Sequence, residues 1–332
     1  MSNPTPQLDI TTAPFTSTGL STNRLMYEVL LAVTPVAAAS VWFFGVAALL
    51  VMLASCLGVV ITEWLFMTDR KGLGSLKDGS GLLTGILLAM TLPPSIPLWM
   101  AFLGGVVSIA LGKAIWGGLG QNIFNPALVG RAFLQSAFPV VMTTWAEPGA
   151  GLAAMRSSTF AVPLAQAATD VTTAATPLGL AKFEHQFTEF LPLLLGNTGG
   201  SLGETAGVII ILAGLWMGFR KLFDWRLPVS TLLTVVVASG IMHLVDPTAY
   251  PGPQFMVCSG GLLFGAVYMV TDPVTTPITP RGMWIFGLGV GLLVVLIRLW
   301  GGLPEGVMYS ILLMNSVTPL INRYTQPKIF GG

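Results

Sequence analysis

The feature that most constrains this chain is a series of apolar runs, each close to the length needed to cross a lipid bilayer. A spanning helix requires roughly 20 predominantly apolar residues. Such runs lie at 26–45, 47–67, 80–93, 97–116, 123–144, 205–222, 227–245, 254–271, 283–300 and 304–322. The pattern predicts an all-α polytopic membrane protein with about ten transmembrane helices.

The scarcity of charge supports the same class. Charged residues make up 9% of the 332 residues, against about 25% in an ordinary soluble domain. So few charges cannot cover a water-exposed surface, and the net charge of +1 excludes the basic groove of a nucleic-acid-binding protein. The lipid bilayer is therefore a predicted partner, and nucleic acid is not.

The positions of Lys and Arg predict the orientation, because basic residues gather in cytoplasmic loops. If the N-terminus is cytoplasmic, the outer side holds only Arg156, Lys182 and Arg298, and Arg131 falls inside a span. The cytoplasmic side then holds Arg24, Arg70, Lys71, Lys77, Lys113, Arg220, Lys221, Arg226, Arg281, Arg323 and Lys328. We therefore expect both termini in the cytoplasm and the long polar excursion after residue 144 on the periplasmic side of a bacterial inner membrane.

These features divide the chain into five segments. They are a cytoplasmic N-terminal segment at 1–25, a first membrane repeat at 26–144, a periplasmic loop at 145–204, a second membrane repeat at 205–322 and a cytoplasmic tail at 323–332.

The division into two membrane repeats comes from an internal similarity. Ser80-Gly-Leu-Leu-Thr-Gly resembles Ser259-Gly-Gly-Leu-Leu-Phe-Gly, each followed by a Thr-x-Pro, and Trp-Gly-Gly-Leu occurs at both 116–119 and 300–303. The copies are five spans apart, so they would run in opposite directions. Inverted repeats with broken helices build central sites in many transporters. Two alternatives stay open: chance similarity in a chain rich in Gly and Leu, and glycines that only allow close helix packing.

The polar excursion contains the segment Asp170-Val-Thr-Thr-Ala-Ala-Thr-Pro-Leu178. Its residues are small, polar and flexible, as in a linker. Pro177 disfavours a helical backbone at Thr176, so we expect an extended residue with an exposed hydroxyl. From the residues alone, the segment is a linker that carries one carboxylate and several hydroxyl groups.

The segment also resembles the sequence Asp-x-x-[Ser/Thr]-[Gly/Ala]-Ala-Thr, on whose last Thr a flavin transferase attaches FMN through a phosphoester. Three further blocks resemble the same family, which contains the D-type subunit of the Rnf electron-transport complex and the B-type subunit of the sodium-pumping NADH:quinone oxidoreductase. They are Ser80–Leu83 with Leu92–Trp99, Asn122–Phe133, and Thr271–Pro277. The resemblance covers roughly residues 24–325, and the short N-terminal region favours the Rnf member.

The resemblance implies covalent FMN on Thr176, with Asp170 and Thr173 as parts of the acceptor sequence. One departure concerns the Gly that the family commonly has before Ala-Thr, where this chain has Ala174. The hydroxyl groups of Thr172 and Thr173 compete as acceptors, but only Thr176 has the spacing from Asp170 that the family shows.

Further candidate residues lie in the other blocks. The resemblance implies a second, non-covalent riboflavin contacted by an Asn-x-x-Asn pair, which Asn122 and Asn125 match; the alternative is that Asn125 with the following Pro only caps a broken helix. Arg131, inside a span, is a candidate for pairing with a helix C-terminus or a ligand; the alternative is that its long side chain snorkels toward the membrane interface. Asp272 is a candidate ion contact, and no other metal ligand and no catalytic residue is predicted.

We therefore expect a membrane electron-transfer subunit of an ion-translocating ferredoxin:NAD⁺ oxidoreductase that moves Na⁺ or H⁺. The resemblance implies partner subunits with iron–sulfur clusters, an NAD site and a second FMN, and a flavin transferase for maturation. The chain is not expected to act as an enzyme alone. The alternatives are a stand-alone secondary transporter or channel, and the B-type subunit of the quinone reductase.

Overall fold

A computed structural model describes residues 21–71, 77–149, 151–152, 158–162, 173–196 and 198–327 of the chain. Asp170 lies outside the described residues, and of Thr173 only the backbone is described.

The first half of the described chain consists of helices separated by short turns. They are α1 (Thr22–Phe44), α2 (Val46–Lys71), α4 (Ser80–Met90), α5 (Leu98–Ile109) with the π-helix η1 (Ala110–Ala114), α6 (Pro126–Ala137) and α7 (Pro139–Met142).

A connecting region and a second set of helices follow. The connecting region contains β1 (Trp145–Ala146), β2 (Thr173–Ala174), α8 (Pro177–Gly179), the π-helix η2 (Leu180–Glu184) and α9 (Phe190–Leu195). The second set contains α10 (Gly207–Phe219), α11 (Arg226–Val245), α12 (Pro253–Cys258), α13 (Leu262–Phe264) with the π-helix η3 (Gly265–Met269), α14 (Pro280–Trp300) and α15 (Val307–Thr325).

The helical, membrane-spanning class predicted from the sequence is confirmed. Within the described residues, four helices are long and apolar enough to cross a bilayer: α1, α2 up to Phe66, α11 and α14. Helical residues also occur in each of the other predicted ranges, but these helices are shorter, interrupted or more polar. The total of ten crossings therefore stays a prediction.

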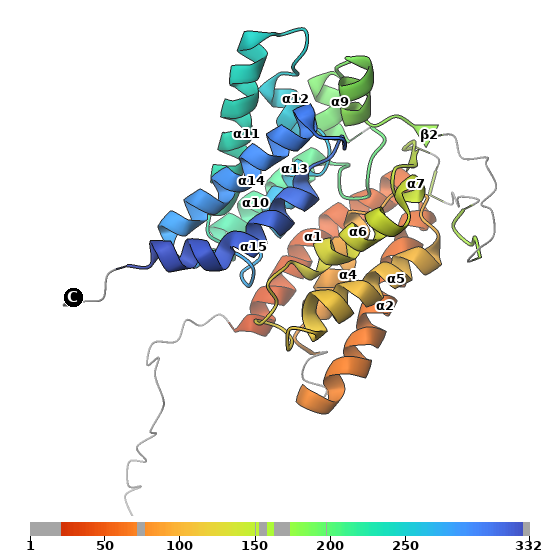
Figure 1. Cartoon of the computed structure of the whole chain (residues 1–332). Helices are drawn as coiled ribbons and strands as arrows, with labels where there is room; N and C mark the ends of the chain where they lie inside the picture. The colour runs from red at the N-terminus through yellow and green to blue at the C-terminus, as the bar shows by residue number, and fades with distance from the viewer. Residues whose placement is uncertain are drawn as a thin grey trace, which may run out of the picture.

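The two sets of helices lie on opposite sides of the molecule, as the red-to-yellow and teal-to-blue ribbons in Figure 1 show. Within each set the most extensive packing joins the second long helix to a later one, α2 to α5 and α11 to α14. Between the sets, α1 packs on α10 and α6 packs on α15. One continuous apolar core includes buried side chains from both sets, among them Leu88 and Phe286.

Both regions predicted as broken helices contain an early end or an interruption. The helix α4 ends at Met90, shortly before Pro93 and Pro94. In the second set, α12 ends at Cys258, and Gly260 has a φ of +63° before helical structure resumes at Leu262. A Cβ at Gly260 would also lie 2.5 Å from Leu178 Cδ1, so Gly is required there for both the backbone and the packing.

Candidate functional site

The backbone around Thr176 is held at the mouth of a pocket. The strand β2 pairs antiparallel with β1, with Trp145 opposite Ala174. Two residues later, Thr176 is extended, at φ −71° and ψ 150°, as the following proline predicts. Its hydroxyl oxygen accepts a hydrogen bond from the Gly179 N–H at 3.0 Å. This N-cap contact fixes a partly buried hydroxyl at the start of α8.

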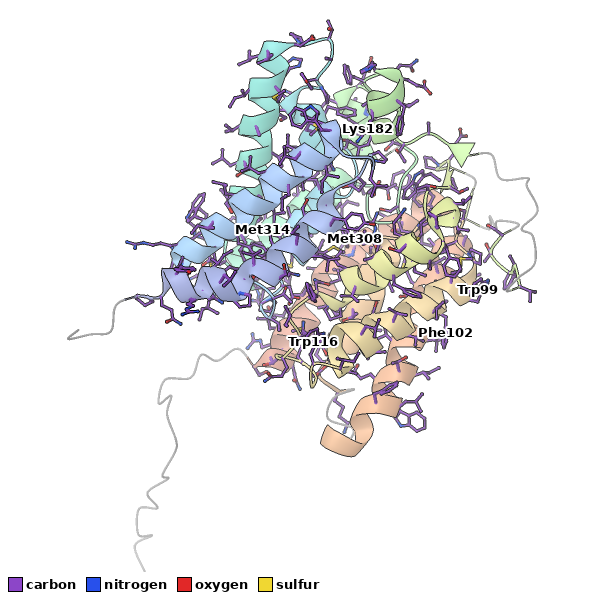
Figure 2. All side chains as sticks on the ribbon, viewed as in Figure 1. Trp99, Phe102, Trp116, Lys182, Met308 and Met314 are labelled. Carbon is purple, nitrogen blue, oxygen red and sulfur yellow. The ribbon has the colours of Figure 1, made fainter. Side chains whose placement is uncertain are left out.

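Lys182 anchors the segment that follows Thr176. Its Nζ donates hydrogen bonds to the carbonyl oxygens of Ile297 at 3.2 Å, Leu303 at 2.9 Å and Gly301. These carbonyls lie at and just beyond the C-terminal end of α14, where a cation is favoured by the helix dipole. Lys182 is labelled in Figure 2. Burial lowers the pKa of Lys182. The three hydrogen bonds dock α8 and η2 on the second set of helices.

The resulting cavity, which we call the Thr176 pocket, has a volume of about 590 Å³. Its wall combines the segment 175–180 with Arg131 and Gln135 of α6, the loop between α14 and α15, and the start of α15. Aromatic rings of Trp145, Phe183 and Tyr309 also line it. The volume lies within the range of about 300–1,000 Å³ found for small-molecule and cofactor sites.

Glu305, which lines the Thr176 pocket, is paired with Arg298. The Arg298 guanidinium lies 3.2 Å from Glu305 Oε1 and also donates to the Ser259 carbonyl at 3.0 Å. Glu305, in the loop between α14 and α15, accepts hydrogen bonds from the N–H groups of Gly261 and Val307 at 3.1 and 3.3 Å. Burial alone would raise the pKa of Glu305, but the nearby Arg298 and Arg131 hold it below its ordinary value.

Arg131 and Glu204 occupy the same wall. Arg131 is 8% exposed, its side chain makes no hydrogen bond to the described residues, and its Nε is buried without a partner. Glu204 lies in the loop before α10, whose Leu202 and Gly203 N–H groups bond to the end of α4. Burial, and next the Glu305 carboxylate, raise the pKa of Glu204. The wall therefore contains a guanidinium with no bonded partner among the described residues.

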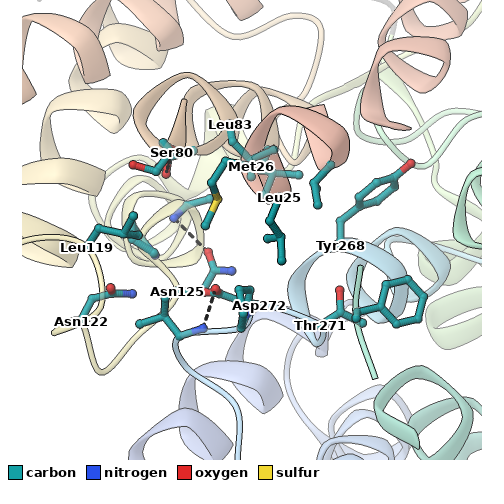
Figure 3. A pocket seen from close by; sticks show the side chains of 18 of the residues that line it. Leu25, Met26, Ser80, Leu83, Leu119, Asn122, Asn125, Tyr268, Thr271 and Asp272 are labelled. Atoms are coloured by element: carbon teal, nitrogen blue, oxygen red, sulfur yellow. Dashed lines mark hydrogen bonds between the residues drawn. The ribbon is translucent and has the colours of Figure 1, made fainter. Parts of the chain in front are cut away.

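A second cavity, which we call the Asn125 pocket, lies at the other end of α6 and is shown in Figure 3. Its volume is about 70 Å³. Asn125 caps α6, because its Oδ1 accepts hydrogen bonds from the Ala127 and Leu128 N–H groups at 3.1 and 3.4 Å. Asn125 is therefore a helix cap, and its contact with a flavin stays a prediction. Asn122 donates to the Phe124 carbonyl at 3.2 Å, and its Oδ1 is buried without a partner in the described part of the chain.

Asp272 lines the Asn125 pocket as well. Its carboxylate accepts hydrogen bonds from the Val274 N–H and the Thr275 hydroxyl, both at 3.2 Å. The structure therefore brings together Asn122, Asn125 and Asp272, three residues predicted from two separate blocks. A flavin and an ion at this pocket both stay predictions. A volume of 70 Å³ lies well below the range of about 300–1,000 Å³ found for cofactor sites, so a flavin would require the surrounding helices to open.

A buried ion pair beside the Asn125 pocket was not predicted. The Lys113 ammonium lies 2.6 Å from Glu63 Oε1 and 2.6 Å from the Ser80 hydroxyl, and both charged side chains are at most 2% exposed. The charge pattern predicts that Lys113 lies on the cytoplasmic side, which stays a prediction. It did not indicate that the side chain is buried against Glu63. Glu63 is the single acid within the 47–67 run, which is the signal that could have indicated a buried partner.

Glu204 and Glu305 were also missed as site residues. A usable signal existed for Glu305, which comes two residues after the second Trp-Gly-Gly-Leu block, in the position that Gln121 has after the first. Glu204 has no comparable signal, since its loop is brought to the pocket by contacts with α4.

Comparison with known proteins assigns the family. Residues 9–331 match the model of the NQR2, RnfD, RnfE family. The chain belongs to this family. It is 41% identical to a Clostridium ljungdahlii protein named as the D subunit of a proton-translocating ferredoxin:NAD(+) oxidoreductase complex, over 97% of this chain and 96% of the relative.

Two further relatives of the NQR2, RnfD, RnfE family extend the comparison. A Stutzerimonas stutzeri protein named as the D subunit of an ion-translocating oxidoreductase complex is 41% identical over 94% of this chain and 92% of the relative. A protein of the same name from Escherichia coli strain SE11 is 35% identical over 97% of this chain and 98% of the relative. The family resemblance found from the sequence blocks is therefore confirmed over nearly the whole chain.

Proposed function

We propose that this chain is a membrane electron-transfer subunit of an Rnf-type, ion-translocating ferredoxin:NAD⁺ oxidoreductase, with FMN attached to Thr176 through a phosphoester. The full-length similarity to proteins named as D subunits of such complexes supports the assignment to a complex. It favours this function over a stand-alone channel and over the B-type subunit of the quinone reductase. The coupling ion is Na⁺ or H⁺.

The observation that carries the flavin proposal is the position of the Thr176 hydroxyl at the mouth of a large pocket. The acceptor-like segment ends at Thr176, and the pocket beside it has a volume of about 590 Å³ with aromatic side chains and an unpartnered guanidinium in its described wall. These residues fit a tricyclic, negatively charged cofactor. When bound, FMN would supply the electron transfer, and the protein would hold and tune it.

The sequence contains no cysteine cluster for an iron–sulfur centre, which supports the presence of partner subunits that carry such centres. Its two cysteines, Cys56 and Cys258, lie in separate apolar runs far apart in the chain, which is unlike the closely spaced cysteines of iron–sulfur sites. We propose that iron–sulfur clusters, the NAD site and a second FMN are carried by other subunits, and that a flavin transferase modifies Thr176.

The helix packing supports an inverted repeat in this proposal. If α1, α2, α5 and α6 correspond to α10, α11, α14 and α15, the α2–α5 contact corresponds to α11–α14, and α5–α6 corresponds to α14–α15. The contacts α1–α10 and α6–α15 then join each helix to its own counterpart, as expected across a pseudo-two-fold axis. We place both termini in the cytoplasm and the Thr176 pocket on the periplasmic side of the inner membrane.

In-gel fluorescence of the denatured chain tests the attachment site. The full chain, produced in cells that contain the flavin transferase, should give a fluorescent band, and Thr176→Ala should abolish it. Thr173→Ala is the matched control, because it removes a neighbouring hydroxyl from the same segment and should retain the band. A fluorescent Thr176→Ala band would contradict the site, and a wild-type band without fluorescence would contradict the covalent flavin.

A further inference from the structure

Arg131 differs from the other buried basic residues of the described chain in having no bonded partner. Lys113 pairs with Glu63 and Ser80, and Arg298 pairs with Glu305 and two backbone carbonyls. Arg131 is buried as well, at 8% exposure, but its side chain donates no hydrogen bond to the described residues. A guanidinium is charged at any physiological pH, and burying it without hydrogen bonds is unfavourable. The side chain is therefore arranged for a group that comes from outside the described residues.

The charges around Arg131 leave the pocket wall suited to an anion. The negative charge of Glu305 is balanced by Arg298, with which it forms a direct ion pair. Burial favours the neutral form of Glu204. Glu184, at the rim of the same pocket, is exposed to solvent. Of the two buried arginines near Glu305, Arg298 is bonded to that carboxylate, whereas Arg131 retains donors that no described residue accepts from.

The position of Arg131 on α6 separates it from the attachment point. Thr176 is partly buried and lines the pocket from the connecting region. Arg131, at 8% exposure, lines the same pocket from α6, a helix of the first set. A ligand fixed at Thr176 that fills the pocket would therefore contact a wall that includes Arg131. A flavin enters such a pocket with its ring system, whose pyrimidine edge carries carbonyl oxygens and gains negative charge on reduction.

We propose that Arg131 is a positioning residue that donates hydrogen bonds to the pyrimidine edge of the flavin attached at Thr176 and so stabilises its reduced form. This inference rests on the proposed function, because it requires a flavin in the Thr176 pocket. Arginine suits the role because its planar donors match two acceptors side by side, and charge near the ring nitrogens is a known determinant of flavin reactivity. Arg131 thereby ties the flavin to the first set of helices.

A spectroscopic redox titration of the full chain tests this role. We compare wild type with Arg131→Gln, with Arg131→Lys, and with Arg220→Gln as a matched control that removes a surface guanidinium, bonded to Glu28, far from the pocket. Thr176→Ala is titrated alongside, so that flavin held elsewhere is subtracted. Arg131→Gln should retain the fluorescent band and shift the equilibrium at least tenfold toward the oxidised flavin, about 30 mV for a two-electron couple.

The variants distinguish failure of the proposed role of Arg131 from failure of the proposed flavin attachment at Thr176. Arg131→Lys should give an intermediate shift, and Arg220→Gln should titrate like wild type. Equal midpoint potentials in wild type, Arg131→Gln and Arg131→Lys would overturn the role of Arg131 while leaving the attached flavin in place. A fluorescent band in Thr176→Ala would instead overturn the proposed attachment. If Arg131→Gln yields no folded chain, an unchanged potential in Arg131→Lys still contradicts the proposal.

Discussion

The two pockets along α6 differ in volume and in the state of their polar groups. The Thr176 pocket encloses about 590 Å³ and contains a guanidinium without a bonded partner among the described residues. The Asn125 pocket encloses about 70 Å³, its asparagine caps a helix, and the lysine in its wall is paired. The two pockets thus differ in size and in their buried cations, since Arg131 has no bonded partner in the described chain and Lys113 is paired. In the second pocket one asparagine caps α6, and only the Asn122 Oδ1 is buried and unpartnered among its described side chains.

Removing the paired lysine should have the largest effect on stability. Lys113→Met leaves Glu63 buried without the ammonium that lies 2.6 Å away. Breaking a buried ion pair from one side typically costs about 3–5 kcal/mol, so thermal unfolding in detergent should begin at a clearly lower temperature than in wild type.

Two further variants test whether the loss of stability in Lys113→Met comes from breaking the ion pair. The double variant Lys113→Met with Glu63→Gln should recover part of the loss, because no uncompensated charge is left. Arg131→Gln should lose much less stability than Lys113→Met, since Arg131 leaves no bonded partner behind in the described chain. If the two single variants were destabilised equally, the contrast between the pockets would fail.

A moderate and pH-dependent effect is expected at the Thr176 pocket. Glu305→Gln weakens charge-assisted contacts to Arg298 and to two N–H groups, which should lower stability by about 1.5–3 kcal/mol. The pKa of Glu305 is lower in the folded protein than its ordinary 4.5. Its contribution is therefore complete above about pH 4.5 and decreases as the pH falls further.

Unfolding measured from about pH 7 to about pH 3 tests the Glu305 prediction. The difference in stability between wild type and Glu305→Gln should be constant near neutral pH and should shrink in acid. A difference that stays the same throughout the acid range would show that the Glu305 carboxylate is not held ionised by its guanidinium neighbours.

The smallest effect is expected at the helix cap of the Asn125 pocket. Asn125→Ala removes the acceptor for two N–H groups at the start of α6, which should cost about 1 kcal/mol. Asn125→Asp keeps an oxygen in the same place and should restore most of that stability. The non-covalent flavin content of both variants should be measured as well. Loss of flavin in both variants would assign a ligand role to Asn125. A normal flavin content in Asn125→Asp would show that Asn125 acts only as a helix cap.

The sequence predicted those parts of the fold that depend on local patterns. The ranges 227–245 and 283–300 agree with α11 and α14 within about three residues, because each is a long uninterrupted apolar run with few charges. The extended backbone of Thr176 followed from the next residue being proline. The helix break before α6 followed from the Asn-Pro pair at 125–126.

The proximity of residues that are distant in the chain could not be predicted from the sequence. Arg131, Glu204 and Glu305 reach one pocket from α6, from the loop before α10 and from the loop after α14. No spacing in the chain connects these positions, because their proximity depends on how the two sets of helices pack. The same reason explains Lys113, because its burial depends on contact with Glu63 of α2, which no spacing in the chain indicates.

Mass spectrometry of the peptide that carries Thr176 tests the central claim most directly. Trypsin should release residues 157–182 from the full chain, because Arg156 and Lys182 bound this segment. We expect the peptide to be heavier by one FMN less one water, with fragmentation assigning the added mass to Thr176. An unmodified peptide from chain produced with an active flavin transferase, or an added mass on Thr172 or Thr173, would contradict the proposed attachment.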